Sequence, residues 1–244
     1  MVAQSNDIFV GPEDERVPLW RYMDFAKFVS ILTEGGLYFA RVDHLGDNFE
    51  GTHAKGVQPI DLSPPPQVDE AQLRDAIKKS RVLARQTSRE LKTRIFVSSW
   101  YMSEHESAAM WKLYGFNEQA IALKTSFRKL KFQLPADVFL GMVRYIDYEK
   151  DFIPGGNFWF PFVHKRKSFE HEREVRAIFA YALNRVPETK IGEWRKVDLQ
   201  TLIDGVYVAP TAPAWFQELV SSTSSKFGFA FQAHRSSLDQ DPLW

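Results

Sequence analysis

Cysteine is absent from the 244-residue sequence, which excludes a disulfide scaffold, a zinc site built on thiolates and a cysteine nucleophile. The six histidines include no HExxH pair, the usual zinc-peptidase motif. Neither Ser98 nor Ser99 sits in a nucleophile elbow, and no glycine-rich phosphate loop is present. The sequence therefore gives no support for thiol, zinc-peptidase, serine-hydrolase or P-loop chemistry.

An excess of charge of either sign is also missing. Lys plus Arg equals Asp plus Glu at 31 each, so binding to nucleic acid or to an acidic membrane would need a local patch. No apolar run approaches the roughly 18 residues of a membrane-spanning helix, and the first residues lack the pattern of a signal peptide. We therefore expect a soluble, cytoplasmic protein without a membrane partner.

No linker or internal repeat divides the chain, and 244 residues of which 44% are hydrophobic can bury a substantial core. We expect one domain over 1–244. Within it, a flexible lead is expected over 1–16 and a stiff proline connector over 62–67.

Helix and strand patterns follow one another without regular alternation, which favours an α+β fold over a doubly wound sheet. Asp24 predicts the start of a helix that Gly35 ends, and Ser103 with Glu106 predicts a capping box before another helix. The expected architecture is a mixed, largely antiparallel sheet flanked by helices. Strands are predicted over 17–22, 37–41, 95–101, 120–124, 140–148, 193–197, 205–208 and 229–233, and further helices over 68–94 and 214–225.

The densest charge pattern lies in the segment 165–183, KRKSFEHEREVRAIFAYAL, whose second half is nearly all apolar. If a strand begins near Glu172, its period of two places Glu172, Glu174 and Arg176 on one face. Such groups either neutralise one another in a surface ion-pair ladder or bind a ligand. Lys165 and Arg166 are further cations that can take part.

Aromatic residues gather in two places. On the helix after Glu106, the side chains of Trp111 and Tyr114 fall on one face with Ser107 and Met110, a pattern typical of a core that can also form the wall of a ligand site. The loop over 151–162, DFIPGGNFWFPF, either lies on the core or covers a ligand.

The loop over 42–56 contains residue types that ligate metals, but Asp and Gly in loops more often form turns, and no metal site is predicted. The helix over 68–94 is locally basic and can either contact phosphates or form a solvated outer face. Its basic residues are Arg74, Lys78, Lys79, Arg81, Arg85, Arg89, Lys92 and Arg94.

Carboxylates beside guanidinium groups, with aromatics nearby, suit two kinds of chemistry. A carboxylate pair can bind a divalent metal for phosphodiester cleavage, with Lys165 or Arg166 steadying the phosphate. Alternatively, a carboxylate can bind a ribose hydroxyl and support an oxocarbenium-like centre, while aromatics hold the departing base and an arginine grips a pyrophosphate.

Four motifs resemble those of a bacterial family catalogued as a domain of unknown function: WRYM at 20–23, DNFEG at 47–51, ESAAMWKLYG at 106–115 and KRKSFEHEREVR at 165–176. The resemblance runs from Val17 to the C-terminus and implies no particular reaction. The chain departs from it at Ser99, where relatives often carry cysteine, and at Asn48, where proline is common.

A more distant resemblance is to the ADP-ribosyltransferase superfamily, through the order of an arginine, a serine-bearing strand and a Glu-x-Glu pair. It implies an ADP-ribosyltransferase-like architecture with NAD as substrate and a protein or nucleic acid as acceptor. It also implies Arg21 on the pyrophosphate, Ser98 as a support, Glu174 on the nicotinamide ribose and Glu172 toward the acceptor. The remaining implied residues are Trp100, Trp111 and Tyr114 around NAD, and Lys165, Arg166, Arg176 and Glu106 in support.

Three hypotheses follow. The first is an NAD-cleaving ADP-ribosyltransferase or NAD glycohydrolase in which Glu174 stabilises the oxocarbenium-like centre. The second is a metal-dependent nuclease or nucleic-acid-binding module that uses the basic helix 70–94. The third is a non-catalytic domain that docks a partner protein through Phe158 and Trp159 of the aromatic loop.

Overall fold

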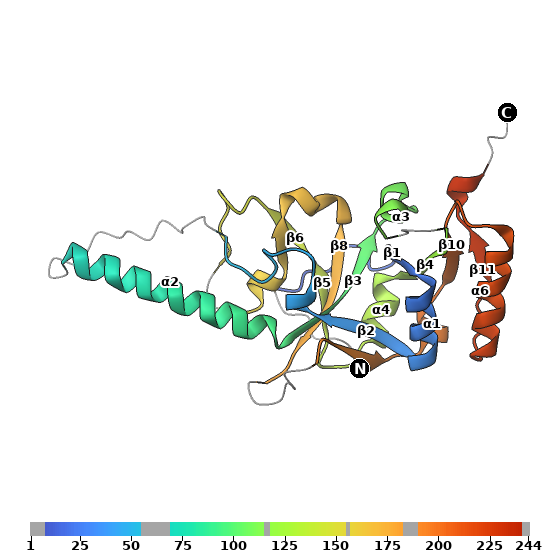
Figure 1. The fold of residues 1–244 in the computed structure, drawn as a ribbon, viewed down its shortest axis with the longest axis horizontal. Helices are drawn as coiled ribbons and strands as arrows, with labels where there is room; N and C mark the ends of the chain where they lie inside the picture. The colour runs from blue at the N-terminus through green and yellow to red at the C-terminus, as the bar shows by residue number, and fades with distance from the viewer. Residues whose placement is uncertain (1–7, 55–68, 115–117, 155–156, 183–189, 241–244) are drawn as a thin grey trace.

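The structure, a computed structural model, describes residues 8–54, 69–114, 118–154, 157–182 and 190–240 (Figure 1). The proline connector over 62–67 and the Gly-Gly pair at 155–156 lie outside the described residues. The strands are β1 (Pro18–Asp24), β2 (Gly36–Arg41), β3 (Ile95–Met102), β4 (Ala120–Ser126), β5 (Phe139–Met142), β6 (Arg144–Ile146), β7 (His164–Arg166), β8 (Glu174–Ala180), β9 (Gly192–Lys196), β10 (Gly205–Val208) and β11 (Ala233–Arg235). The α-helices are α1 (Phe25–Glu34), α2 (Glu70–Lys92), α3 (Ala108–Tyr114), α4 (Phe127–Gln133), α5 (Leu199–Leu202) and α6 (Ala214–Lys226), and the short 3-10 helices are η1 (Val42–His44), η2 (Phe160–Phe162), η3 (Lys167–Glu172) and η4 (Ser237–Asp239).

The prediction of a single-domain α+β fold with a largely antiparallel sheet is confirmed. A nine-stranded sheet contains the strand path β11-β10-β4-β1-β3-β2-β9, with β8 and β5 attached through β3. The pair β10 and β11 is parallel, and the other pairs of this sheet are antiparallel. A second, two-stranded sheet pairs β6 and β7 in parallel.

Strand β3 is the branch point of the large sheet. One edge of β3 pairs with β8 from Ile95 to Tyr101. The other edge is shared, because β2 pairs with Phe96 and Val97 while β1 pairs with Tyr101 and Met102. Ser98 and Ser99, at the middle of β3, therefore lie between the part of this edge that pairs with β2 and the part that pairs with β1.

Helix α1 shows how local sequence sets an element boundary. The Asp24 side chain accepts a hydrogen bond from the backbone N–H of Lys27, as an N-cap does. At the other end Gly35 adopts a left-handed conformation with φ of 55°, which a glycine tolerates without strain. Both caps were predicted correctly.

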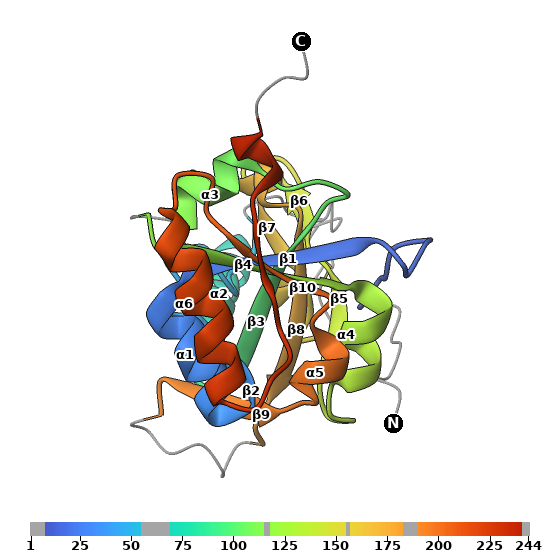
Figure 2. The same ribbon diagram turned by 90° about the vertical axis from the view of Figure 1, so that its right-hand side faces the viewer.

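Helices cover the sheet on two sides. In Figure 2, α1 and α6 lie together on one side, where the rings of Phe25 and Phe216 meet edge to face at 5.5 Å, and α4 and α5 lie on the other. Helix α2 is different, because Figure 1 shows it reaching away from the sheet into open space. None of the helices in the described part of the chain is long and apolar enough to cross a membrane.

Two strand predictions were wrong. The predicted strand over 140–148 is two strands, because the chain leaves β8 at Val143 and pairs next with β7. The last strand begins at Ala233, not at Phe229. The backbone of Phe229 instead bonds to Ser224 at the end of α6, and its ring stacks on that of Phe231 at 5.2 Å. Tertiary contacts overrode the apolar pattern in both segments.

The prediction of a capping box formed by Ser103 and Glu106 was also wrong. Helix α3 begins at Ala108, and the Ser107 hydroxyl accepts from the backbone N–H of Met110 as its cap. The segment 1–16 was expected to be flexible, but within it the side chains of Ile8 and Phe9 are buried. The Phe9 ring stacks on a ring of β5 at 4.7 Å, so this segment belongs to the core.

Candidate functional site

Strand β8 begins at Glu174 and not near Glu172. Glu172 ends the short helix η3, and Arg173 then adopts a left-handed conformation with φ of 38° before the strand starts. The period-two prediction is therefore wrong for Glu172. It holds for Glu174 and Arg176, which pair with Tyr101 and Ser99 across β3 and share one face of the sheet.

Arg176 is the centre of a buried ion cluster, which we define as Glu50, Lys165, Glu172, Glu174 and Arg176. Its guanidinium donates two hydrogen bonds to Glu174, at 2.7 and 3.0 Å. It donates two more to Glu50, at 2.6 and 2.8 Å. The Arg176 side chain is 1% exposed, so both carboxylates depend on it for charge compensation.

Lys165 joins the three carboxylates of the ion cluster. Its ammonium lies 2.5 Å from Glu172, 3.3 Å from Glu174 and 3.6 Å from Glu50. The cluster thus contains three carboxylates and two cations, an excess of one negative charge. A charge excess inside a protein favours a ligand that brings positive charge or hydrogen-bond donors.

Glu174 is held ionised by its neighbours. Burial raises the pKa of this carboxyl, but the charges of Arg176 and Lys165, with hydrogen bonds from Arg176 and Ser99, lower it to about 2. The backbone N–H of Glu174 also donates to the Tyr145 hydroxyl at 2.8 Å. Both carboxylate oxygens accept hydrogen bonds from protein groups, and the residue is 5% exposed.

A pH dependence of stability follows from Glu174. Its pKa is lower in the folded protein than the ordinary value of 4.5, so its contribution is present above about pH 4.5 and is lost as the pH falls toward 2. We expect the free energy of unfolding, measured with urea at several pH values, to fall less steeply in Glu174→Gln over this window. The exposed neighbour Glu170→Gln should keep the wild-type slope, and equal slopes in all three proteins would contradict this assignment.

A second ion pair lies beside the cluster. The Arg166 guanidinium donates to both oxygens of Asp47, at 2.7 and 3.3 Å. The same group lies over the ring of Phe49 at 4.4 Å and over the ring of Phe169 at 5.2 Å. Arg166 is more exposed than the cluster residues, with 36% of its side chain accessible. It is therefore a cation that a ligand at this edge can reach.

The solvent edge of the ion cluster is formed by Glu172 and Tyr114. The Glu172 side chain is 13% exposed, against 5% for Glu174 and 2% for Glu50. Tyr114, at the end of α3, is 43% exposed. Burial of its hydroxyl raises the pKa of Tyr114, and the charges of Glu172 and Glu174 raise it further. An exposed aromatic side chain therefore lies within electrostatic range of Glu172, the least buried carboxylate of the cluster.

Arg21, Ser98 and Trp100 lie on the other face of the sheet. Ser98 pairs with Ala177 and therefore points away from the face of Arg176. The Arg21 guanidinium donates to the Ser98 hydroxyl at 2.7 Å and lies 5.6 Å from the centre of the Trp100 ring. Burial lowers the pKa of Arg21 to about 10. The structure does not bring these three residues together with Glu174.

Glu106 and Trp111 make contacts of a structural kind. The Trp111 ring is buried, meets the ring of Tyr22 edge to face at 4.9 Å, and donates from Nε1 to Glu106 at 3.1 Å. The Glu106 carboxylate also accepts from Ser236 and Ser237, which follow β11. This carboxylate ties α3 to the end of the described chain, and it is not part of the ion cluster.

The acidic residues of the 42–56 loop are bound by arginines. Asp43 pairs with Arg41 at 2.7 Å, Asp47 pairs with Arg166, and Glu50 pairs with Arg176. No group of three or more His, Asp or Glu residues in the described part of the chain is arranged to hold a metal ion. This loop therefore supplies counter-charges to the neighbouring Arg41 and to the distant Arg166 and Arg176.

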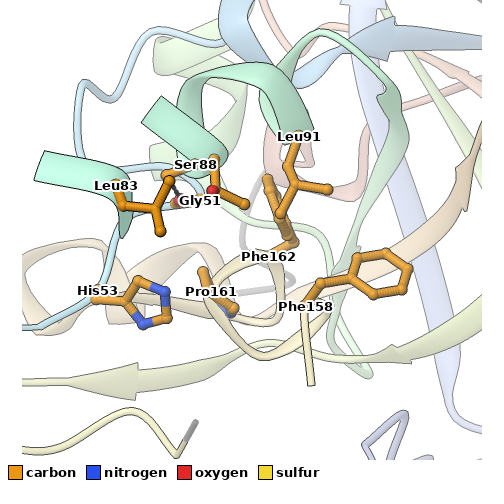
Figure 3. A pocket seen from close by; sticks show the side chains of 9 residues that line it. Gly51, His53, Leu83, Ser88, Leu91, Phe158, Pro161 and Phe162 are labelled. Carbon is orange, nitrogen blue, oxygen red and sulfur yellow. Dashed lines mark hydrogen bonds between the residues drawn. The ribbon is translucent and has the colours of Figure 1, made fainter. Parts of the chain in front are cut away.

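The aromatic loop divides between the core and a pocket. Trp159 is buried against Phe9, while Phe158 is 45% exposed. Figure 3 shows Phe158 and Phe162 facing the end of α2 across a pocket of about 340 Å³. The pocket adjoins the ion cluster through backbone. Its wall residue Gly51 follows Glu50 in the sequence, and the carbonyl of its wall residue Phe162 accepts a hydrogen bond from Arg176. Its lining is Gly51, His53, Leu83, Thr87, Ser88, Leu91, Phe158, Pro161 and Phe162.

Three residues whose side chains bond to Glu174 or Arg176 were not predicted as site residues, namely Glu50, Ser99 and Tyr145. Glu50 contacts Arg176 across 126 positions of sequence, and Tyr145 contacts Glu174 across 29. Glu50 does lie in the DNFEG motif, whose acidic residue before a glycine was the available indication. Its arginine partner could not be identified from the sequence.

Comparison of the chain with models of protein families, with curated proteins and with solved structures finds no match.

Proposed function

We propose that the protein is an NAD-cleaving enzyme of the ADP-ribosyltransferase type, acting at the solvent edge of the ion cluster. The observation that supports this proposal is the excess negative charge of the cluster, with Glu172 as its most accessible carboxylate. Cleavage of the bond between ribose and nicotinamide develops positive charge on the ribose. A fixed negative charge beside that ribose stabilises the transition state.

The roles that we propose for Glu172 and Glu174 differ from those that the resemblance to ADP-ribosyltransferases implies. Both oxygens of Glu174 accept hydrogen bonds from Ser99, Arg176 and Lys165. We therefore assign the ribose hydroxyl to Glu172. Glu174 instead positions Lys165, whose ammonium holds Glu172 at 2.5 Å. The C–N bond breaks, nicotinamide leaves with the bonding electron pair, and water or an acceptor nucleophile adds to the ribose carbon.

We assign the nicotinamide and the diphosphate of NAD to side chains at this edge that solvent can reach. The accessible ring of Tyr114 provides a surface on which the nicotinamide can stack. Arg166 is an accessible guanidinium beside the cluster and suits the diphosphate, with which its pair to Asp47 would compete. Arg21 is not assigned this role, because it points to the opposite face of the sheet.

The test is NAD turnover in Glu172→Gln. We expect millimolar NAD to raise the melting temperature of the wild type, and nicotinamide to be released on incubation. Glu172→Gln should lower the rate of release by about 100-fold, which is the typical effect of removing one transition-state contact. Nicotinamide release is followed by chromatography.

The matched control is Glu170→Gln, which removes the same charge from an exposed position two residues away. This variant should turn over NAD at the wild-type rate. Absence of both NAD protection and nicotinamide release in the wild type would refute the proposal. An equal loss in both variants would refute the role of Glu172. Glu174→Gln is a weaker test, because it also disturbs the buried pairing of Arg176.

A further inference from the structure

Helix α2 concentrates positive charge in a chain that has none in excess. Its 23 residues contain seven basic and three acidic side chains, a net charge of +4, while the formal net charge of the whole chain is +0. Figure 1 shows that the helix extends away from the sheet. The positive charge of its N-terminal part is therefore presented away from the sheet.

The basic residues follow one side of the helix. Arg74, Lys78, Arg89 and Lys92 recur at the spacing that keeps side chains on one face, and the arginines at sequence positions 81 and 85 continue that spacing. With a rise of about 1.5 Å per residue, the row from 74 to 92 is roughly 27 Å long. We call this row the basic stripe. Arg74, Lys78 and Arg89 are exposed to solvent.

Acidic residues of α2 do not interrupt the centre of the stripe. Asp75 pairs with Lys79 at 2.8 Å, and helical spacing places both of them off the stripe. The C-terminal end of the helix docks on the body, where Leu83, Thr87 and Leu91 line the pocket. Ser88, on the flank of the stripe, donates to the Gly51 carbonyl at 2.6 Å. At this end Lys92 of the stripe donates to the Asn48 carbonyl at 3.5 Å, whereas the side chains of Arg74, Lys78 and Arg89 are exposed to solvent.

We propose that the basic stripe binds the phosphate backbone of a nucleic-acid duplex. A row of cations of this length matches closely spaced phosphates, and release of counterions from the duplex drives such binding. Single strands are usually held by stacking on aromatic rings, and α2 contains no aromatic residue. A membrane-surface helix also needs several bulky apolar groups opposite its charges, whereas α2 places Gln72, Ala76 and Thr87 there beside a single leucine, Leu83.

Binding of this kind is measured on the full-length protein with a labelled duplex of about 20 base pairs, as DNA and as RNA, at several salt concentrations. We expect weak binding that falls as salt rises. In the variant with Lys78→Gln and Arg89→Gln, the slope of log affinity against log salt should be smaller by about 2, and affinity at low salt should fall at least roughly tenfold.

The control pair is Lys79→Gln with Lys226→Gln, which removes the same total charge from exposed positions off the stripe. It should change affinity and slope much less. An equal loss in both pairs would overturn the proposal, and so would an absence of duplex binding or tighter binding to anionic phospholipid vesicles than to the duplex. The proposal is independent of NAD cleavage, because Glu172→Gln should bind the duplex like the wild type.

Discussion

Replacing Arg176 with methionine is expected to lower the free energy of unfolding by about 3–5 kcal/mol, the range observed when one partner of a buried ion pair is removed. Arg176 makes two hydrogen bonds to each of Glu50 and Glu174, and it is nearly inaccessible to solvent. Without it, two buried carboxylates share the single ammonium of Lys165. Denaturation by urea, followed by circular dichroism at neutral pH, measures the difference.

Arg173→Met is the matched control for this change. Arg173 is exposed and lies three residues before Arg176, so its replacement should alter the free energy of unfolding by less than about 0.5 kcal/mol. Adding Glu50→Gln to Arg176→Met should recover part of the loss, because one uncompensated charge is removed. A loss below about 1 kcal/mol in Arg176→Met would show that the cluster contributes little to stability.

Gly51→Ala is expected to destabilise the protein by about 2–4 kcal/mol. Gly51 has a φ of 64°, a conformation that costs a residue with a side chain about 1 kcal/mol or more. A Cβ atom there would lie 2.3 Å from the ring of Phe162, so the ring or the loop must move. Overpacking of this kind typically costs a further 1–3 kcal/mol. Thermal and urea unfolding of the variant measure the sum of these two costs.

Gly46→Ala provides the comparison in the same loop. No atom lies within 4 Å of a Cβ built at Gly46, and its φ is not in the left-handed region. We expect this substitution to change stability by no more than about 0.5 kcal/mol. If both glycines tolerate alanine equally, the close approach of Gly51 to Phe162 does not constrain the loop that presents Glu50.

Elements with local determinants were predictable from the sequence. Asp24 and Gly35 bound α1 because both caps act within one helical turn. The capping box failed because the Glu106 carboxylate is used by Trp111, Ser236 and Ser237, and a distant donor cannot be seen in a local pattern. The same limit explains the strand that divides at Val143.

The candidate site was predictable only in part, for two physical reasons. The charge density of the 165–176 segment identified Lys165, Glu174 and Arg176, and the two cations contact Glu174 over short sequence distances. Glu50 reaches them through a long-range contact. The faces of the sheet were the second difficulty, because adjacent positions in a strand point in opposite directions. Ser98 and Ser99 therefore serve different partners, Arg21 and Glu174.

The long sequence separation between Glu50 and Arg176 also bears on how the protein folds and unfolds. A contact across 126 residues requires closure of a loop that spans about half of the 244-residue chain. Helix α1 and its caps need no such closure. Interactions that are absent from the folding transition state slow unfolding without accelerating folding. We therefore expect the Glu50–Arg176 contact to form late in folding, so that Arg176→Met mainly accelerates unfolding and shortens the lifetime of the native state.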